Sequence, residues 1–441
     1  MLNFLWRYDG SYIFPEDHRF GFFPGIMGGW RISQENFFKD NVHFIDNLKL
    51  RASWGQMGAE PYFLGTTTLA EYQYLGTYGL DRSYIINDAL AQTLYETRVL
   101  NPNFTWEVSN STNFGMDGTM LRGKVNFEFD VFFNKRDKAL IPQTGSIPAS
   151  SGITNLLPPV NLGKVNNKGW EFKVGYNGQA GDLTYSVSAN GGYAKNKIVF
   201  WDEAPGVPEW QRSTGHPFGS NGAAWLAYQY DGVFKDQSEI AGNKIDYSAV
   251  GGKDLRPGDM KFKDINGDGK ITGDDKVRLD NTRDPTFTGG FSANLQYKNF
   301  DLSILFQGAT GGLLFFGTES GDIGNYLQYS YDHRWSIDNP SSVDPRLANR
   351  NNTYYSGGDG GNNTYWLRNS NYLRLKNFEI GYNIPASLGE RAGISNFRIY
   401  ANGLNLITWD KMKIWDPEST SGNGQYYPQA RVINIGARIT F

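Results

Sequence analysis

The sequence predicts an all-β fold, namely an antiparallel transmembrane β-barrel in which each strand has one face toward lipid and one toward water. Three observations predict this fold class. Apolar and polar residues alternate over unusually long stretches, the connections between the stretches are short and long in turn, and the last stretch ends on an aromatic residue. Because residues two apart lie on the same face of a strand, this alternation predicts a sheet with one apolar and one polar face.

The stretch from Asn113 to Asn134 shows the alternation most clearly. On either side of a short turn at 121–124, the pattern continues through a whole strand. Strands of soluble proteins usually have about five or six residues, whereas a tilted strand needs about 9–11 to cross a bilayer. We therefore predict a membrane-spanning hairpin. One face holds Phe114, Met116, Met120, Val125, Phe127, Phe129, Val131 and Phe133, and the other holds Asn113, Asp117, Thr119, Asn126, Glu128, Asp130 and Asn134.

The same pattern predicts twelve strands, joined by connections of two kinds. The turns at 121–124, 178–182 and 299–300 are short, and the segments 58–103, 142–160, 200–285, 313–371 and 409–429 are long. Bacterial outer-membrane barrels have short periplasmic turns and long extracellular loops, so we expect every long segment to lie outside. The count requires the strand-like segment Ala224–Phe234 to belong to one excursion over 200–285. The strands are predicted at about 2–13, 20–33, 47–57, 104–120, 125–141, 161–177, 183–199, 286–298, 301–312, 372–384, 397–408 and 430–441.

The last predicted strand ends on an aromatic residue of its apolar face. Ile433, Ile435, Ala437, Ile439 and the terminal Phe441 share one face. A terminal aromatic residue on an alternating strand resembles the signal that the outer-membrane assembly machinery recognises. The ending therefore favours a barrel over a soluble sandwich.

Composition excludes several other classes. The chain has 441 residues, 53 of them glycine, with 15% aromatic residues and no cysteine. A mean hydropathy of -0.50 and the lack of any run of about 18 apolar residues argue against a helical membrane protein. The net charge of -3 does not suggest a nucleic-acid partner, and the missing cysteines remove disulfide scaffolds and thiol catalysis. Since the first residues are not a signal peptide, we expect the C-terminal part of a longer protein.

The segment 264–275 fits the pattern of a calcium-binding loop. Such loops place oxygen ligands at positions 1, 3, 5, 7, 9 and 12 and a glycine at position 6, which here is Gly269. The carboxylate at position 12 is an aspartate, which is shorter than the usual glutamate. A solvated Asp/Gly turn without metal is the alternative. The predicted ligands of a structural calcium ion are Asp264, Asn266, Asp268, Lys270 (through its carbonyl), Thr272 and Asp275.

Aromatic residues gather in the segments predicted to face outward. Flat rings there could stack on sugars or pack against a partner, and the alternative is that they hold long loops together. We single out Trp201, Trp210, Trp225, Trp335 and Trp366 as candidate substrate-binding or partner-binding residues, and the same group contains Tyr329, Tyr354, Tyr355 and Tyr365.

Several blocks of sequence resemble the C-terminal barrel of the SusC/RagA-type TonB-dependent (TonB-linked) outer-membrane transporters of Bacteroidota. The blocks occur in the order found in that family and cover nearly the whole chain. They include LKLRASWG from Leu48, NLGKVNNKGWE from Asn161, PGDMKF from Pro257, YLRLKN from Tyr372, and Asp416-Pro417-Glu418.

The resemblance implies a function that composition alone does not. It implies active import of large nutrients, oligosaccharides or peptides, by a multi-pass β-barrel of the cell outer membrane. A SusD-like surface lipoprotein would close the outer mouth, TonB would supply energy through an N-terminal plug, and a dimer of transporter–lid pairs would be consistent with the family. Since family barrels have roughly 22 strands, residues 1–441 would form the C-terminal portion, without signal peptide or plug.

Two function classes remain open at this stage. The first is the importer, and the second is a non-transporting, calcium-stabilised surface protein that binds glycans or mediates adhesion. We do not expect an enzyme, because nucleophile elbows, phosphate loops and zinc motifs are missing and the histidines are scattered.

Overall fold

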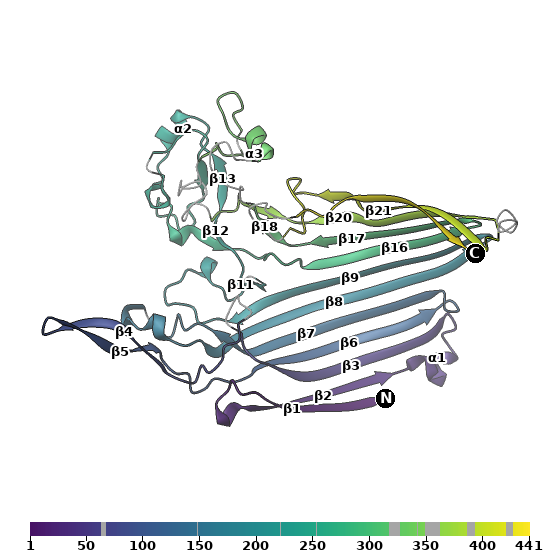
Figure 1. Ribbon diagram of the computed structural model, residues 1–441, viewed down its shortest axis with the longest axis horizontal. Coiled ribbons are helices and arrows are strands. Elements are labelled where there is room, and N and C mark those ends of the chain that lie inside the picture. The colour runs from purple at the N-terminus through teal and green to yellow at the C-terminus, as the bar shows by residue number, and fades with distance from the viewer. Residues whose placement is uncertain are drawn as a thin grey trace. The chain divides into compact units, whose positions relative to one another are not determined.

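A computed structural model describes residues 1–62, 68–147, 149–220, 222–252, 254–316, 327–341, 343–348, 362–385, 393–419 and 427–441 (Figure 1). Twelve strands form one antiparallel sheet, in which neighbours in space follow the order of the chain. Each of the twelve predicted strands is present, so this prediction is confirmed. The strands are β1 (Leu2–Gly10), β2 (Phe20–Trp30), β3 (Ile45–Ala59), β6 (Glu107–Met120), β7 (Val125–Ile141), β8 (Val160–Ala180), β9 (Leu183–Phe200), β16 (Phe287–Tyr297), β17 (Phe300–Thr310), β20 (Tyr372–Ile384), β21 (Asn396–Asp410) and β22 (Val432–Thr440).

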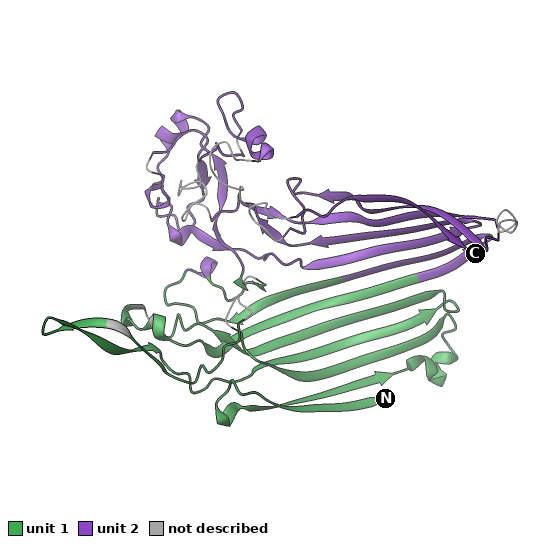
Figure 2. Cartoon of the chain, in the orientation of Figure 1, with its two compact units in different colours: residues 1–175, 192–207, 212–223 green, residues 176–191, 208–211, 224–441 purple. Residues whose placement is uncertain are grey.

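The chain divides into two compact units, and the boundary crosses β8 and β9 (Figure 2). Unit 1 comprises residues 1–175, 192–207 and 212–223, and unit 2 comprises residues 176–191, 208–211 and 224–441. Helices are few and short, and no helix in the described ranges is long and apolar enough to span a membrane. They are η1 (Glu16–His18), η2 (Ile32–Gln34), α1 (Asn36–Lys39), η3 (Ala149–Ser151), η4 (Thr154–Leu156), η5 (Glu209–Gln211), α2 (Gln237–Gly242), η6 (Ser248–Val250), η7 (Gly273–Asp275) and α3 (Gln328–His333).

The register of β3, β6 and β7 in unit 1 separates the two kinds of side chain as predicted. Leu50 pairs with Met116, which pairs with Phe129, and these three share the apolar face. One residue along, Arg51 pairs with Gly115, and Gly115 pairs with Asp130 on the polar face.

An arginine bridges two carboxylates on that polar face. Arg51 Nη2 lies 2.7 Å from Asp117 Oδ1 and 2.8 Å from Asp130 Oδ2. The guanidinium fills the space above Gly115, where an added Cβ would lie 2.8 Å from its Cζ. Glycine is therefore needed at this point of the strand, because a side chain would push the arginine away from its partners.

Unit 2 repeats the arrangement with different residues. Arg398 of β21 donates to Asp301 of β17 and to Glu379 of β20, in the second case over 2.8 Å. A Cβ added at Gly381 would lie 2.6 Å from the Arg398 Cζ. Each unit thus has an arginine that lies over a glycine and bridges two neighbouring acidic side chains.

Smaller elements lie outside the twelve-stranded sheet. The connection 58–103 contains a hairpin of β4 (Thr77–Ile86) and β5 (Ala89–Arg98), turned by Asn87 and Asp88 with φ of 51° and 57°. Positive φ at both turn residues suits the twist of a two-residue hairpin. The segment Ala224–Phe234 contributes β12 (Leu226–Tyr228) and β13 (Tyr230–Val233), which pair with β15 (Lys276–Arg278) and β14 (Met260–Phe262). The remaining strands are β10 (Phe218–Gly219), β11 (Gly222–Ala223), β18 (Leu313–Phe315) and β19 (Leu367–Asn369).

Long connections of unit 2 fold together into a body with its own hydrophobic core, which we call the loop body. The loop body is defined by its buried core residues, and its partly buried neighbours include Ile414 and Trp415. Burial raises the pKa of Tyr247 in this core to about 12. The core residues are Tyr228, Phe234, Tyr247, Val250, Met260, Phe262, Ile271, Phe316, Ala348 and Trp366.

The packing of Arg51 over Gly115 gives a first prediction. Gly115→Val should displace the guanidinium and lower stability by about 1–3 kcal/mol, as overpacking usually does. Loss of the folded gel band on heating, measured on the detergent-solubilised chain, would report this. Gly28→Ala is the control, because an added Cβ there has only Leu2 Cδ1 nearby, at 3.9 Å. Equal melting of both variants would contradict the proposed packing.

Candidate functional site

The predicted calcium loop is closed by its own backbone. Asp264 accepts hydrogen bonds from the N–H of Gly267 (2.7 Å) and of Gly269 (2.8 Å). These glycines have φ of 75° and 79°, a left-handed conformation that glycine adopts without strain. The sharp turn that the pattern predicts at Gly269 is therefore present, and Gly267 forms a second one that was not predicted.

The other end of the loop is tied by Asp275. This side chain is fully buried and accepts from the N–H groups of Ile265 and Thr272, each at 2.8 Å. The Thr272 hydroxyl accepts in turn from the N–H of Asp274, which completes a capping box at η7. The two ends of the loop are thus held together by one carboxylate.

The middle of the loop has not gathered its side chains around one point. Asn266 donates to Asp268 Oδ2 at 3.1 Å, and Asp268 Oδ1 accepts from the N–H of Lys270 at 2.8 Å. Among the described residues, no three acidic, histidine or cysteine side chains are placed to hold a metal ion. Binding of calcium would therefore require Asn266 and Asp268 to turn toward the carboxylates at the ends of the loop.

The loop is anchored on both sides within unit 2. Ile271 is fully buried in the core of the loop body. Trp210 donates its indole N–H to the Asp274 carbonyl at 2.8 Å, and Gln211 donates to the Gly273 carbonyl at 2.7 Å. Trp210, predicted as a binding aromatic, thus supports the loop.

Three more of the predicted binding aromatics pack within the loop body. Trp366 is 3% exposed and its ring centre lies 4.9 Å from that of Tyr365. Trp225 stacks on Phe315 at 6.2 Å, and Trp335 lies so close to Gly258 that a Cβ there would be 2.6 Å from its Cε3. Tyr329 also lies at this core, whereas Tyr354 and Tyr355 lie outside the described residues.

An ion pair of the loop body involves a residue from one of the family-like blocks. Asp259 is buried, and Arg346 Nε donates to it at 2.6 Å. Burial raises the pKa of Asp259 above its usual range although Arg346 opposes this. The pair joins segments that are 87 residues apart.

Trp201, the fifth predicted aromatic, lines a pocket in unit 1 of about 420 Å³. We call it the strand-end pocket, because its walls are ends of β6, β7, β8 and β9 together with Tyr62 and Phe218. Glu107, one of its walls, is buried and accepts from Arg136 and from the N–H of Leu140. The lining residues are Tyr62, Glu107, Ser109, Asn134, Arg136, Ala139, Leu140, Ile141, Gly163, Lys164, Val165, Asn167, Asn196, Phe200, Trp201 and Phe218.

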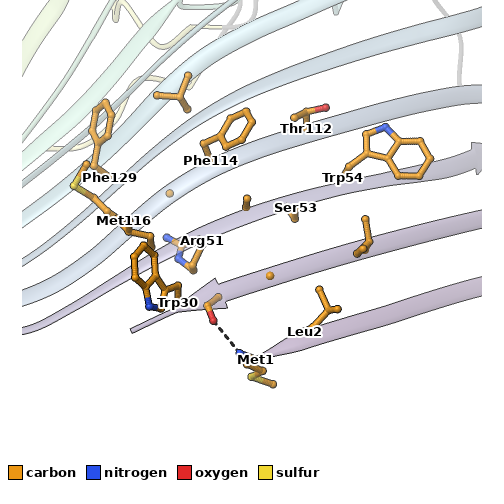
Figure 3. A pocket seen from close by; sticks show the side chains of 17 residues that line it. Met1, Leu2, Trp30, Arg51, Ser53, Trp54, Thr112, Phe114, Met116 and Phe129 are labelled. Carbon is orange, nitrogen blue, oxygen red and sulfur yellow. Dashed lines mark hydrogen bonds between the residues drawn. The ribbon is translucent and has the colours of Figure 1, made fainter. Parts of the chain in front are cut away.

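A larger hollow of about 880 Å³ lies elsewhere in unit 1 (Figure 3). Its rings and aliphatic side chains, among them Leu50, Trp54, Phe114 and Phe129, belong mostly to the apolar face of the sheet. Such a surface offers few hydrogen-bonding groups to a polar ligand.

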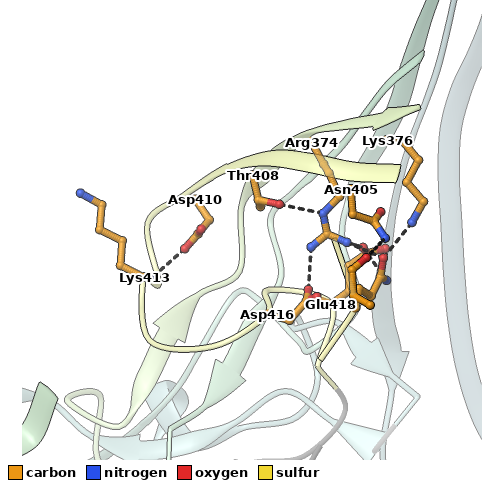
Figure 4. Close-up of polar contacts among 10 residues, drawn as sticks. Arg374, Lys376, Asn405, Thr408, Asp410, Lys413, Asp416 and Glu418 are labelled. Atoms are coloured by element: carbon orange, nitrogen blue, oxygen red, sulfur yellow. Dashed lines mark hydrogen bonds and ion pairs between the residues drawn. The ribbon is translucent and has the colours of Figure 1, made fainter. Parts of the chain in front are cut away.

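A buried arginine network in unit 2 is a feature that the sequence reasoning missed (Figure 4). Arg374 of β20 is 2% exposed and donates to Thr408, Asp416, Glu418 and Gln429. These contacts fasten the segment 410–419, which follows β21, to the strands. The blocks around Tyr372 and Asp416 were visible in the sequence, but neither block indicates that the two are in contact.

Comparison with known proteins shows which family this chain is related to. TonB-dependent receptor P26 of Formosa agariphila is 29% identical over 469 residues, and SusC of Bacteroides thetaiotaomicron, a TonB-dependent receptor, is 26% identical over 468. Both alignments cover 100% of this chain. The chain is homologous to the SusC-type TonB-dependent receptors. It spans 44% and 42% of the lengths of these two relatives, and no protein-family model matches it.

Solved structures show the same fold. The RagAB peptide transporter aligns with a TM-score of 0.71 at 23% identity, covering 100% of this chain and 46% of that one. The RagAB peptide importer in its open-open state gives a TM-score of 0.72 at 22% identity. The predicted fold class and the resemblance to the C-terminal barrel of SusC/RagA transporters are thereby confirmed. Because these relatives are receptors and transporters, the prediction that the chain is not an enzyme is also confirmed.

The Arg374 network gives a second prediction. Arg374→Ala would leave buried carboxylates without their cation, a loss that usually costs about 3–5 kcal/mol. We expect the segment 410–419 to detach and to lose hydrogen-exchange protection while the strands stay protected. Lys411→Ala, which removes an exposed cation from the same segment, should change nothing. Unchanged protection in the Arg374 variant would show that the network does not fasten the segment.

Proposed function

We propose that the chain forms part of the wall of an outer-membrane importer for large nutrients. The observation that carries this proposal is the exposed apolar face of the twelve-stranded sheet. Phe4, Phe114 and Ile435 are 69%, 54% and 82% exposed on long strands of alternating polarity. A soluble protein would normally cover so many apolar side chains, whereas a barrel in lipid leaves them outward.

The position of the buried cores supports the same reading. The loop body lies in the connections of unit 2, and a second core in unit 1 gathers at strand ends around Ile13, Phe14 and Phe104. In the described part of the chain, neither core joins the apolar faces of two stacked sheets. This argues against the alternative, a surface sandwich that binds glycans or mediates adhesion.

The polar face suits a water-filled passage. Arg51 and Arg398 each bridge two carboxylates there, so this face holds sets of charged groups with one cation and two anions each. The lumen of a transmembrane barrel is polar because it faces water, and its outer surface is apolar because it faces lipid. Solutes would therefore move along this face.

The relatives suggest how such an importer works. By analogy with SusC and RagAB, a SusD-like lipoprotein would cover the outer mouth and TonB would drive import through parts of the receptor not contained in residues 1–441. The cargo would be an oligosaccharide, as the family resemblance implies, or a peptide, since the RagAB structures are those of a peptide transporter. The outer membrane would be the location of this multi-pass barrel.

Adjacent residues on the two faces of β6 give the third prediction. Phe114→Arg should reduce the folded, heat-modifiable fraction in the outer membrane, because arginine on a lipid face costs up to about 2–4 kcal/mol. Asn113→Arg, one residue earlier on the polar face, should be tolerated. Membrane fractionation and gels of unheated samples measure both. If Phe114→Arg folds as well as Asn113→Arg, or the chain extracts in buffer, the proposal is wrong.

We also propose that the loop 264–275 binds a structural calcium ion. The spacing of Asp264, Asn266, Asp268, Lys270, Thr272 and Asp275 supports this, and the ion would stiffen the excursion 200–285 on which the loop lies. The hydrogen bond between the side chains of Asn266 and Asp268 is what the ion would have to break.

Calorimetry with calcium alone gives the fourth prediction. Calcium should release or absorb heat on binding and raise the melting temperature, and Asp268→Asn should abolish both effects. Asp274→Asn is the matched control, because Asp274 is exposed and is not a predicted ligand. A metal-free turn would give no heat and the same melting temperature with calcium or with chelator.

A further inference from the structure

We propose that a hollow on the apolar face of unit 1 binds an acyl chain of a membrane phospholipid. The hollow is the one of about 880 Å³ in Figure 3, and we call it the apolar hollow. This inference goes beyond the proposed import function but rests on it, because this face meets lipid only in a barrel wall. It gives the chain a ligand that is not cargo.

The register of β1, β2, β3 and β6 forms the hollow, with one row of small residues between two rows of large ones. In the small row Gly28 pairs with Ala52, and the ends of this row are closed by Leu2 and Phe114. The floor of the hollow is therefore low, whereas its sides are tall. The row on one side consists of Trp30, Leu50 and Met116, and the row on the other side contains Ile26 and Trp54.

The spacing of a β-sheet gives this hollow the shape of a slot. Side chains on one face repeat every two residues along a strand, so the two tall rows are about 13 Å apart. Neighbouring strands are about 4.8 Å apart, so the floor runs about 14 Å from Leu2 to Phe114. A Cβ added to Gly28 would have only Leu2 Cδ1 nearby, at 3.9 Å, and the space above the floor is therefore open. A slot of this kind suits an unbranched hydrocarbon chain.

The hollow offers few polar groups to a ligand. Thr112 contributes a hydroxyl, and Arg51 also touches the hollow. The guanidinium of Arg51, however, is bonded on the polar face of the sheet to Asp117 and Asp130. A polar ligand that fills a space of this size would need more bonding partners than these, because buried polar groups must be hydrogen-bonded. The hollow therefore favours hydrocarbon.

The hollow lies near the strand ends that we assign to the periplasm. Trp30 is the last residue of β2, and Met116 is four residues from the end of β6. The Trp30 indole N–H donates to Glu35 at 2.9 Å, and its ring centre lies 6.3 Å from that of Phe37, which is 56% exposed. Exposed aromatic rings at strand ends lie at the level of the lipid head groups. A phospholipid in the hollow would thus belong to the periplasmic leaflet, with its head group beside the connection 31–44.

A second copy of the chain fits this hollow less well than a lipid does. The outer surfaces of two barrels are convex, so they meet along a narrow band and do not reach a floor that lies between Trp30 and Trp54. A void left there would lose dispersion contacts on one side. A mobile acyl chain adapts to the space. Since lipid tails are as apolar as the wall itself, close packing in the slot is what would hold one chain in place.

Photolabelling with a trace of lipid tests this inference on the detergent-solubilised chain. The probe is phosphatidylethanolamine with a diazirine in one acyl chain, added at one molecule per chain, and mass spectrometry identifies the labelled peptides. Because detergent covers the rest of the apolar face, we expect the label mainly on β2, β3 and β6. A double variant with Gly28→Leu and Ala52→Leu, which fills the floor of the hollow, should lower this label at least fivefold.

Ala437→Leu is the matched control, because Ala437, like Ala52, is an exposed alanine on the apolar face of a strand, but it lies on β22 in unit 2. This variant should be labelled like the unaltered chain, and the folded gel band should verify every variant. Label spread evenly over the twelve strands, label that the double variant does not reduce, no label at all, or pairing of chains that the double variant abolishes would overturn the inference. The Phe114/Asn113 pair tests the barrel separately, so a folded barrel that retains no lipid would overturn this inference alone.

Discussion

Strand register is the constraint on which the rest of this structure depends. A shift of one residue would move every side chain of a strand to the opposite face. The ladder that pairs Leu50 with Met116 and Phe129 therefore also places Arg51 beside Asp130. Because main-chain groups must be paired wherever lipid surrounds them, the ladder and the two-faced pattern support each other along the whole sheet. The apolar surface, the bridged charges and the strand-end pocket all follow from this one alignment.

The sequence predicted the repetitive part of the fold and missed the irregular part, for a physical reason. A period of two is a local signal, and it located all twelve strands within a few residues of their ends. Contacts such as Arg374 with Asp416, 42 residues apart, have no local signal. The hairpin of β4 and β5 was overlooked because it lies in a stretch treated as a connection.

The candidate sites were also predicted only where a local sequence pattern exists. The turn glycine Gly269 could be predicted, since a known loop pattern assigns it its place. The environment of the aromatics could not, because position in a connection does not reveal that connections pack on one another. Trp366 became part of a core, whereas Trp201 lines a pocket. The amides beside Trp201 come from three different strands and were not grouped by any motif.

The arginines that lie over Gly115 and Gly381 affect how a solute would move along the polar face of the sheet. Each guanidinium occupies the volume that a side chain at the glycine would fill, so its charge stays close to the backbone. In the importer that we propose, neither guanidinium would narrow the passage at these points, since each lies close to the strand backbone. Because both guanidinium groups are already bonded to carboxylates, they would bind passing cargo only weakly and would not delay its release.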